Sequence, residues 1–304
     1  GAAALRVSGG PLVQNAGTIQ AGSVVLDGTL TNGVTLNGGA VIASAGSILV
    51  NSSLVTVGAN QLVYLALVEP GDRVVSIVPS YQQHTSIPES LGAEVRVLRL
   101  REEGDWRPDL DELQALVGDS AKLITFTNPN NPTGSLMDRA ELERIAEIAE
   151  SCGAYVLGDE VYRGTDQSGE GTTASIADLY ERAISVGSMS KAFSLAGLRL
   201  GWIAGPTDIL HAVSVHRDYN TISVGMLDDH FARLALEHAD EVLARSRRIV
   251  RGNLEILDAW VEGEERISYV KPLSGTTALL RYDADMSSRD FCLRLLEHTG
   301  VMLT

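Results

Sequence analysis

Hydrophobic and polar residues alternate in two ways from about residue 50 to the end of the chain. LMDRAELERIAEIAESCG has helical spacing, with Asp138 and Glu141 as a capping box and Gly153 as the stop. Short apolar runs rich in β-branched residues predict strands at 73–79, 122–128, 154–160 and 183–188. Strands that alternate with amphipathic helices predict an α/β fold with a largely parallel sheet.

The first 50 residues have a different pattern. Between Val7 and Val68 the only charged residue is Asp27, and short β-branched runs are separated by Gly and Asn at spacings of roughly six or seven residues. This pattern predicts short strands joined by tight turns and resembles the rungs of β-solenoid surface proteins. The alternative is an uncharged leader, or a foreign segment joined to a catalytic body.

Composition limits the classes of protein that fit. A chain of 304 residues, 44% of them hydrophobic, can bury a substantial core. A formal charge of -15 argues against a nucleic acid or an anionic membrane as partner. The two cysteines, Cys152 and Cys292, are far apart and the histidines show no metal-binding spacing, so we expect no metal site and reduced thiols in a cytoplasmic protein. No apolar run reaches the roughly twenty residues of a membrane span.

Residues that could bind a ligand follow the predicted strands, where the carboxyl ends of parallel strands meet. Gly58, Ala59 and Asn60 begin an apolar helix, and such a turn can bind an anion or can be a purely structural start. Tyr81 follows the strand at 73–79, where its ring could cover a flat ligand or simply pack. Asn131, in TNPNNPTGS, is held where its amide can point at a ligand oxygen, although this segment can equally be only a turn.

Two further loops carry charged side chains. Asp159 ends the strand at 154–160, and a buried carboxylate there needs a cation or a hydrogen-bond donor, unless it only caps a helix. In VGSMSKAFSLAGLRLGW, Ser188 and Ser190 offer hydroxyls and the Arg199 guanidinium suits phosphate oxygens. Lys191 offers an amine that is nucleophilic when it is neutral, or it is an ordinary surface lysine.

Together these groups fit one ligand, pyridoxal 5'-phosphate. Its phosphate suits the glycine turn, Ser188 and Arg199, while its aldehyde suits Lys191. Its protonated ring nitrogen suits Asp159, its ring oxygen suits Asn131 and Tyr162, and its ring face suits Tyr81. The sequence therefore predicts a binding site for this cofactor.

Three motifs, NPNNPTG, DEVYRG and SMSKAFSLAGLRLGW, resemble the class I/II aminotransferases in order and spacing. These enzymes are fold-type I pyridoxal-phosphate proteins, and the resemblance extends from about residue 54 to the C-terminus. It implies a three-layer large domain with a mostly parallel sheet at 51–239 and an α+β small domain, incomplete here, at 240–304. An atypical β-rich segment at 1–50 precedes them. It also implies a homodimer that moves an amino group between an L-amino acid and a 2-oxo acid.

The resemblance implies a role for each candidate residue. Lys191 forms the aldimine with the cofactor and then moves the proton between substrate and cofactor, and Asp159 keeps the ring nitrogen protonated. Asn131 and Tyr162 hydrogen-bond the phenolic oxygen, and Tyr81 stacks on the ring. The groups that contact the phosphate and its surroundings are Gly58, Ala59, Asn60, Ser188, Ser190 and Arg199.

The sequence departs from the family at both ends. Family members carry a tyrosine upstream of the phosphate turn that reaches the partner's site, and an arginine near the C-terminus that pairs with the substrate carboxylate. No residue of this chain is assigned to either role, so we expect impaired activity. Two alternatives stay open. One is a pyridoxal-phosphate lyase or a cyclase similar to capreomycidine synthase; the other is a non-catalytic surface or interaction protein with a β-solenoid-like N-terminus.

Overall fold

The structure is a computed structural model that describes residues 56–169 and 171–303, together with the backbone of eight short strands within 1–51. Side chains are described from Gly58 onward in these ranges. We expected residues 1–50 to be either solenoid-like or an uncharged leader. The side chains and turns that would distinguish the two lie outside the described residues.

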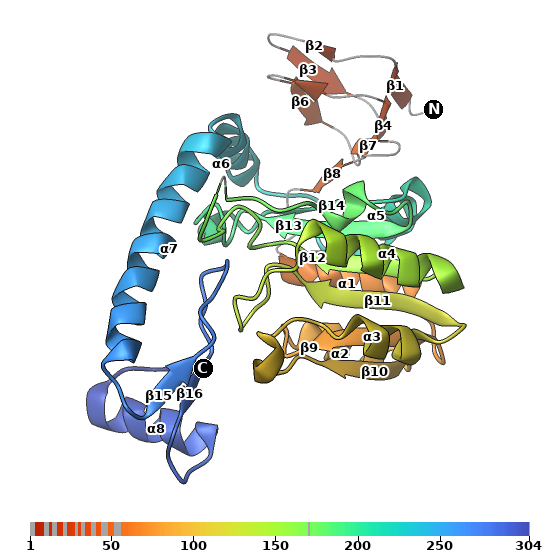
Figure 1. Ribbon diagram of the computed structural model, residues 1–304. Helices are drawn as coiled ribbons and strands as arrows, with labels where there is room; N and C mark the ends of the chain where they lie inside the picture. Colours follow the sequence, from red (N-terminus) through yellow and green to blue (C-terminus); the bar gives the residue numbers. More distant parts are fainter. Residues whose placement is uncertain are drawn as a thin grey trace.

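A seven-stranded sheet lies at the centre of the molecule, in the order β10-β9-β11-β12-β13-β14-β8 (Figure 1). All neighbouring strands pair in parallel except β14, which is antiparallel to both β13 and β8. The predicted mostly parallel sheet is therefore confirmed. The strands are β8 (Ile48–Asn51), β9 (Arg73–Val78), β10 (Glu94–Arg99), β11 (Ala121–Thr127), β12 (Tyr155–Asp159), β13 (Ala183–Ser188) and β14 (Gly201–Ala204).

Helices cover both faces of this sheet. Successive strand residues point to opposite faces. Val74 and Leu123 accordingly pack into one core with residues of α1 and α5, whereas Val75 and Ile124 pack into a second core with residues of α3 and α4. These strands are apolar on both sides because both sides are buried. The helices are α1 (Thr56–Leu67), α2 (Gln83–Ser90), α3 (Leu110–Val117), α4 (Arg139–Cys152) and α5 (Thr207–Asn220), with short 3-10 turns at Glu102–Gly104, Ile176–Asp178 and Ala196–Leu198.

Helix α4 begins and ends where the sequence predicts. The Asp138 side chain accepts a hydrogen bond from the Glu141 backbone N–H, and the Glu141 side chain accepts one from the Asp138 backbone N–H. Gly153 ends the helix with a left-handed φ of 70°. The capping box and the glycine stop are therefore confirmed.

The C-terminal part of the chain leaves the sheet along a long helix (Figure 1). It consists of α6 (Met226–Glu237), α7 (Ala239–Glu262), the antiparallel pair β15 (Ile267–Tyr269) and β16 (Leu280–Tyr282), and α8 (Ser288–Thr299).

The loop before β16 returns to the part of the chain that contains the central sheet. The backbone N–H groups of Leu273 and Ser274 donate to the Gly134 carbonyl at 2.8 and 3.0 Å, and Ser274 Oγ donates to Asp166 Oδ1 at 2.8 Å. Gly134 has a φ of +69°, and a Cβ there would lie 2.5 Å from the Pro272 Cβ. Glycine is therefore required at position 134.

Short parallel strands occupy the N-terminal region. Sheets form from β1, β4 and β7, from β2 and β5, and from β3 and β6, so that each strand pairs with the third strand along the chain. β8 joins the central sheet instead, which therefore begins slightly before the boundary predicted at residue 51. The strands are β1 (Ala4–Ser8), β2 (Leu12–Val13), β3 (Gly17–Gln20), β4 (Ser23–Asp27), β5 (Leu30–Thr31), β6 (Val34–Asn37) and β7 (Val41–Ala43).

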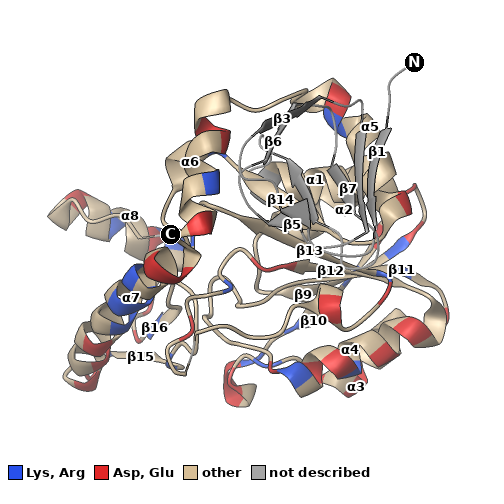
Figure 2. Cartoon of the chain, turned by 90° about the horizontal axis from the view of Figure 1, so that it is seen from above, with Lys and Arg blue, Asp and Glu red and all other residues tan. Residues whose placement is uncertain are grey.

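Charged residues are arranged differently on two helices of the described chain. Figure 2 shows Arg interspersed with Glu along α4, whereas on α7 the arginines within 245–251 lie between acidic residues toward both ends. Across the part of the chain that the structure describes, no helix combines the length and apolar character needed to cross a bilayer. The same residues contain no group of three or more His, Cys, Asp or Glu side chains placed to hold a metal ion.

Candidate active site

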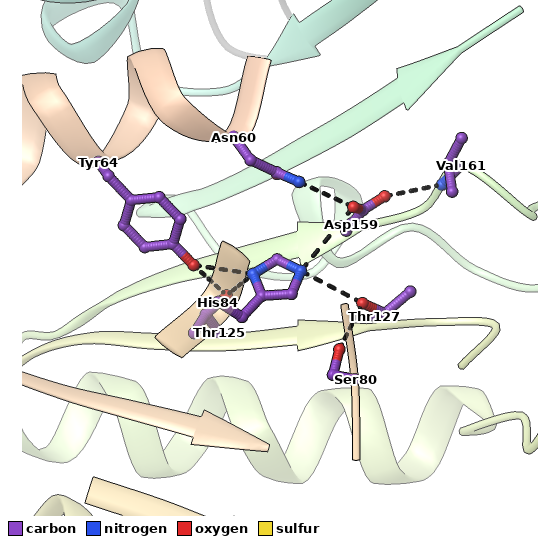
Figure 3. Close-up of polar contacts among 8 residues, drawn as sticks. All are labelled: Asn60, Tyr64, Ser80, His84, Thr125, Thr127, Asp159 and Val161. Carbon is purple, nitrogen blue, oxygen red and sulfur yellow. Dashed lines mark hydrogen bonds and ion pairs between the residues drawn. The ribbon is translucent and has the colours of Figure 1, made fainter. Parts of the chain in front are cut away.

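Asp159 lies at the carboxyl end of β12 and is almost completely buried. Its Oδ2 accepts a hydrogen bond from the Asn60 side-chain amide at 2.8 Å, and its Oδ1 accepts one from the Val161 backbone N–H at 3.2 Å (Figure 3). Asn60 is fully buried on α1. A buried carboxylate requires such donors, because burial without them is costly. The helix α1 and the strand β12 therefore meet at this carboxylate.

Asn60 differs from its predicted role. The sequence assigned Asn60 to the phosphate-binding turn, whereas the structure directs its amide nitrogen to Asp159 and leaves its Oδ1 buried without a hydrogen-bond partner among the described residues. The reason is helical geometry: Asn60 and Tyr64 are four residues apart and lie on the same face of α1. Both side chains therefore point to the sheet.

A buried histidine that sequence reasoning missed lies behind this carboxylate. His84, on α2, is fully buried, and its Nε2 is 3.8 Å from Asp159 Oδ2 and 3.2 Å from Thr127 Oγ1. Its Nδ1 is 2.8 Å from the Tyr64 hydroxyl and 2.7 Å from Thr125 Oγ1 (Figure 3). The available signal was the position of His84, three residues after the candidate Tyr81 and beyond the same strand.

Tyr162 lies near both Asp159 and Lys191. Tyr162 is almost completely buried, and Lys191 Nζ is 6.0 Å from the centre of its ring. Burial and then the negative charge of Asp159 raise the pKa of the Tyr162 phenol, whereas a hydrogen bond with the Thr276 side chain lowers it. Tyr81 also contributes to this electrostatic environment, and it is 39% exposed. The structure therefore brings Asp159, Tyr162, Tyr81 and Lys191 to one region.

A cavity of about 420 Å³ lies beside Lys191. It is lined by α7 and by the loop before β16, including Asn253, Thr276 and Thr277. A larger cavity of about 740 Å³ lies between β13, β14 and the 172–181 loop; Ser188 lines it but Lys191 does not, and Asp159 lines neither cavity. We take the smaller cavity as the candidate active site because the candidate nucleophile Lys191 lines it.

The residues predicted to bind phosphate are only partly brought together. Gly58 and Ala59 lie in the first turn of α1, whose backbone N–H groups have no acceptors within the helix. Ser188 is buried at the end of β13, and its Oγ accepts the Ser190 N–H at 3.3 Å. The Ser190 Oγ is itself buried and has no hydrogen-bond partner in the described ranges.

Arg199 differs from the expected convergence on this phosphate site. Its guanidinium is exposed and donates to the Ala196 carbonyl at 2.6 Å, within its own turn. Its φ of 50° is left-handed, and this turn places the nearby carbonyl within reach of the side chain. This bond uses one of the five N–H donors of the guanidinium, so the others can still bind a phosphate.

The NPNNPTG loop is fixed by its own side chains. The Asn128 amide donates to the Met137 carbonyl and accepts the Met137 N–H, at 3.2 and 2.9 Å. The Asn130 amide donates to the Pro79 carbonyl and to Thr133 Oγ1, at 3.1 and 2.8 Å. Asn131 lies half-buried between these anchors. The backbone of this loop is therefore fixed by these hydrogen bonds in addition to its prolines.

Known proteins resemble this chain in sequence. A model of the family described as aminotransferase class I and II matches residues 46–304. Capreomycidine synthase from Streptomyces vinaceus is 32% identical over 254 residues, which cover 82% of this chain and 65% of that protein. A probable N-succinyldiaminopimelate aminotransferase from Mycobacterium tuberculosis is 31% identical and is covered to 64%. The chain thus spans slightly less than two thirds of the length of these relatives.

Solved structures agree with these matches. A PLP-dependent aminotransferase from Streptococcus suis 89-1591 superimposes with a TM-score of 0.80 at 45% identity, over 84% of this chain and 67% of that chain. The structure of N-succinyldiaminopimelate aminotransferase from Mycobacterium tuberculosis gives a TM-score of 0.75 at 28% identity, over the same shares. The chain belongs to the aminotransferase class I and II family.

Proposed function

We propose that this protein is a pyridoxal-phosphate-dependent aminotransferase that moves an amino group between an L-amino acid and a 2-oxo acid. Family membership and the Streptococcus suis structure support the reaction class. The observation that carries the proposal is the buried Asp159 carboxylate, held by Asn60 at the sheet edge where Tyr162 and Lys191 also lie.

The residues present fit the cofactor that members of this family use. Two buried polar atoms, Asn60 Oδ1 and Ser190 Oγ, have no hydrogen-bond partner among the described residues, and buried polar atoms normally have one. The start of α1 supplies backbone N–H groups and the positive end of a helix dipole, which suit a phosphate. The donor set and the carboxylate are those that a phosphorylated pyridine aldehyde requires.

Each side chain then has a defined task. The cofactor, when bound, stabilises negative charge that develops on the substrate α-carbon. Asp159 would hold the proton on the ring nitrogen, and Asn60 would hold Asp159 in place. Lys191 would bind the aldehyde carbon through Nζ and then move the α-proton. Tyr81 would pack on the ring.

The remaining groups would orient the cofactor. Asn131 and Tyr162 would hydrogen-bond its phenolic oxygen. Its phosphate would be bound by Gly58, Ala59, Ser188, Ser190 and Arg199, the last through donors that the Ala196 carbonyl leaves free. Holding the reacting bond in the right orientation is a positioning effect that can supply several kcal/mol of the barrier reduction.

Covalent labelling tests this proposal. The chain contains three lysines, Lys122, Lys191 and Lys271, so the labelled position is easily resolved by peptide mass. After addition of pyridoxal phosphate and borohydride, we expect a phosphopyridoxyl group on Lys191 alone. Lys191→Ala should lose the label, the absorbance near the visible edge and nearly all turnover, while Lys122→Ala keeps all three. A colourless protein without a label would instead favour the non-catalytic interaction protein.

A second candidate is a cyclase or lyase with the same cofactor, which the similarity to capreomycidine synthase favours. Product masses after incubation with arginine-type and neutral amino acids distinguish the two. A 2-oxo acid formed together with a new amino acid supports transamination, whereas a ring-closed or eliminated product supports the second candidate.

We further propose a homodimer in the cytoplasm. Large apolar side chains are exposed along the end of α5 and α6, including Tyr219, Met226 and Leu227, which are 89, 84 and 71% exposed. A contiguous exposed apolar surface is typical of an interface. Leu227→Lys should therefore shift the mass measured by light scattering toward the monomer, whereas Ile256→Lys, on the exposed face of α7, should not.

The proposed location in the cytoplasm rests on the cysteines. The free thiols of Cys152 and Cys292 support a reducing compartment.

A further inference from the structure

Three polar groups form a closed triangle in the interior between α1, α2 and β11. The Tyr64 hydroxyl is 2.8 Å from His84 Nδ1 and 3.0 Å from Thr125 Oγ1, and Thr125 Oγ1 is 2.7 Å from His84 Nδ1 (Figure 3). All three residues are completely buried. Each proton in the triangle must therefore find its acceptor within it.

The number of protons and acceptors in the triangle determines whether Nδ1 carries a proton. If Nδ1 carries no proton, one hydroxyl donates to Nδ1 and the other donates to the first hydroxyl's oxygen, so both hydroxyl protons have acceptors. If Nδ1 carries a proton, it donates to one oxygen, and one of the two hydroxyl protons has no acceptor left. A buried donor without an acceptor is destabilising. Burial also raises the pKa of Tyr64, so its hydroxyl keeps the proton that this count requires.

The surroundings of Nε2, on the other side of the ring, are compatible with a proton on that atom. Nε2 faces Thr127 Oγ1 at 3.2 Å, and Thr127 Oγ1 in turn contacts Ser80 Oγ at 2.8 Å. Thr127 can donate to Ser80 and accept from Nε2, so a proton on Nε2 has an acceptor. The Asp159 carboxylate lies 3.8 Å from Nε2, beyond hydrogen-bond distance but close enough to be repelled by a bare nitrogen lone pair.

We propose that the Tyr64 and Thr125 hydroxyls together hold His84 as the neutral tautomer with its proton on Nε2. They are positioning residues, since they act on Asp159 through His84. A neutral ring leaves the negative charge of Asp159 available for a cationic partner, which, on the function proposed above, is the ring nitrogen of the cofactor. The helix α1 thus supports Asp159 twice, through Asn60 directly and through Tyr64 indirectly.

The proton count gives an unusual expectation for variants. Tyr64→Phe leaves the Thr125 hydroxyl, and Thr125→Val leaves the Tyr64 hydroxyl, and either remaining proton still needs Nδ1 as its acceptor. Each single variant should therefore keep the tautomer, with an excess of the Nε2–H form of about tenfold or more. Only the double variant Tyr64→Phe/Thr125→Val removes both donors. In the double variant Nδ1 loses both its donors and the only acceptors that the described residues offer it, so the proton stays on Nε2 beside Thr127, and we expect this variant alone to show the Nδ1 resonance of a lone pair without a hydrogen bond.

The experiment is nitrogen-15 NMR on the full chain with labelled histidine. A protonated ring nitrogen and a bare one have well-separated resonances, so the spectrum distinguishes the two neutral tautomers and the imidazolium. Of the six histidines, only His84 is buried, whereas the other five rings are exposed or half-buried. His84→Asn identifies the signals by their loss. Tyr180→Phe is the matched control, because it removes a tyrosine hydroxyl that donates to the Ala154 carbonyl elsewhere.

The outcomes separate cleanly. An Nε2–H pattern in the unmodified chain, in both single variants and in Tyr180→Phe, with displaced resonances in the double variant, supports the proposal. An Nδ1–H or imidazolium pattern in the unmodified chain overturns it, as does an Nδ1 resonance that stays unchanged in the double variant, which would show that neither hydroxyl donates to Nδ1. The measurement needs no cofactor, so it stands even if covalent labelling of Lys191 fails.

Discussion

The hydrogen bond between Asn60 and Asp159 is the contact on which the candidate site depends most directly, and Asn60→Ala removes it. The bond is 2.8 Å long, joins an amide to a carboxylate, and both residues are at most 2% exposed. A hydrogen bond to a charged group contributes about 1.5–3 kcal/mol to stability. For a chain of this size, 1 kcal/mol corresponds to roughly 2–4 °C in the unfolding midpoint. We therefore expect the midpoint of Asn60→Ala to fall by about 3–12 °C.

Calorimetry on a double-mutant cycle isolates this bond from lost packing. Asn60→Ala, Asp159→Ala and the double variant are compared with the unmodified chain, and the interaction free energy should be about 1.5 kcal/mol or more. Gln61→Ala is the matched control, because it removes an exposed amide from the next position of α1. A coupling near zero, or equal midpoints for Asn60→Ala and Gln61→Ala, would refute the claim that this bond holds the carboxylate.

Two further predictions concern the scaffold. Gly187→Ala places a Cβ 2.5 Å from the Trp202 ring and should cost about 1–3 kcal/mol by overpacking, whereas Gly197→Ala, with no atom within 4 Å, should be nearly neutral in urea unfolding. The Glu141 backbone N–H, and then Arg107, hold the pKa of Asp138 below its ordinary value of 3.8. The stabilisation from the Asp138 carboxylate is therefore present above pH 3.8 and lost as pH falls further, so midpoints of the unmodified chain and Asp138→Asn should converge below that pH; a constant difference would contradict this.

Local patterns predicted candidate residues that follow strands. Asp159 and Lys191 became candidates because each belongs to a short motif next to an apolar strand, and parallel strands bring such loops to one edge. The position of His84 beside Asp159 was not predictable in this way. Its partners Tyr64 and Thr125 are 20 and 41 residues away, so their contact depends on how α1 and α2 pack against β11.

Side-chain direction limited the prediction of two other residues. The helical spacing of Asn60 and Tyr64 indicates that both side chains face the sheet. The position of Asn60 at a helix start had instead suggested a phosphate ligand. For Arg199, the sequence indicated a suitable guanidinium but not its rotamer. The left-handed backbone at this residue places the Ala196 carbonyl nearest to it, and the side chain binds there.

The loop before β16 contacts two other loops that are far apart in the sequence. It bonds Gly134, which follows Asn131, and Asp166, which follows Tyr162, so the loops that carry both candidate phenolic-oxygen ligands are fastened to the same C-terminal segment. Any molecule that orders these loops must also stabilise the docked position of this segment, and the segment must strengthen binding by the same factor, because such couplings are reciprocal. Ligand binding should thus protect α7 and α8 from proteolysis although neither helix lies in the central sheet.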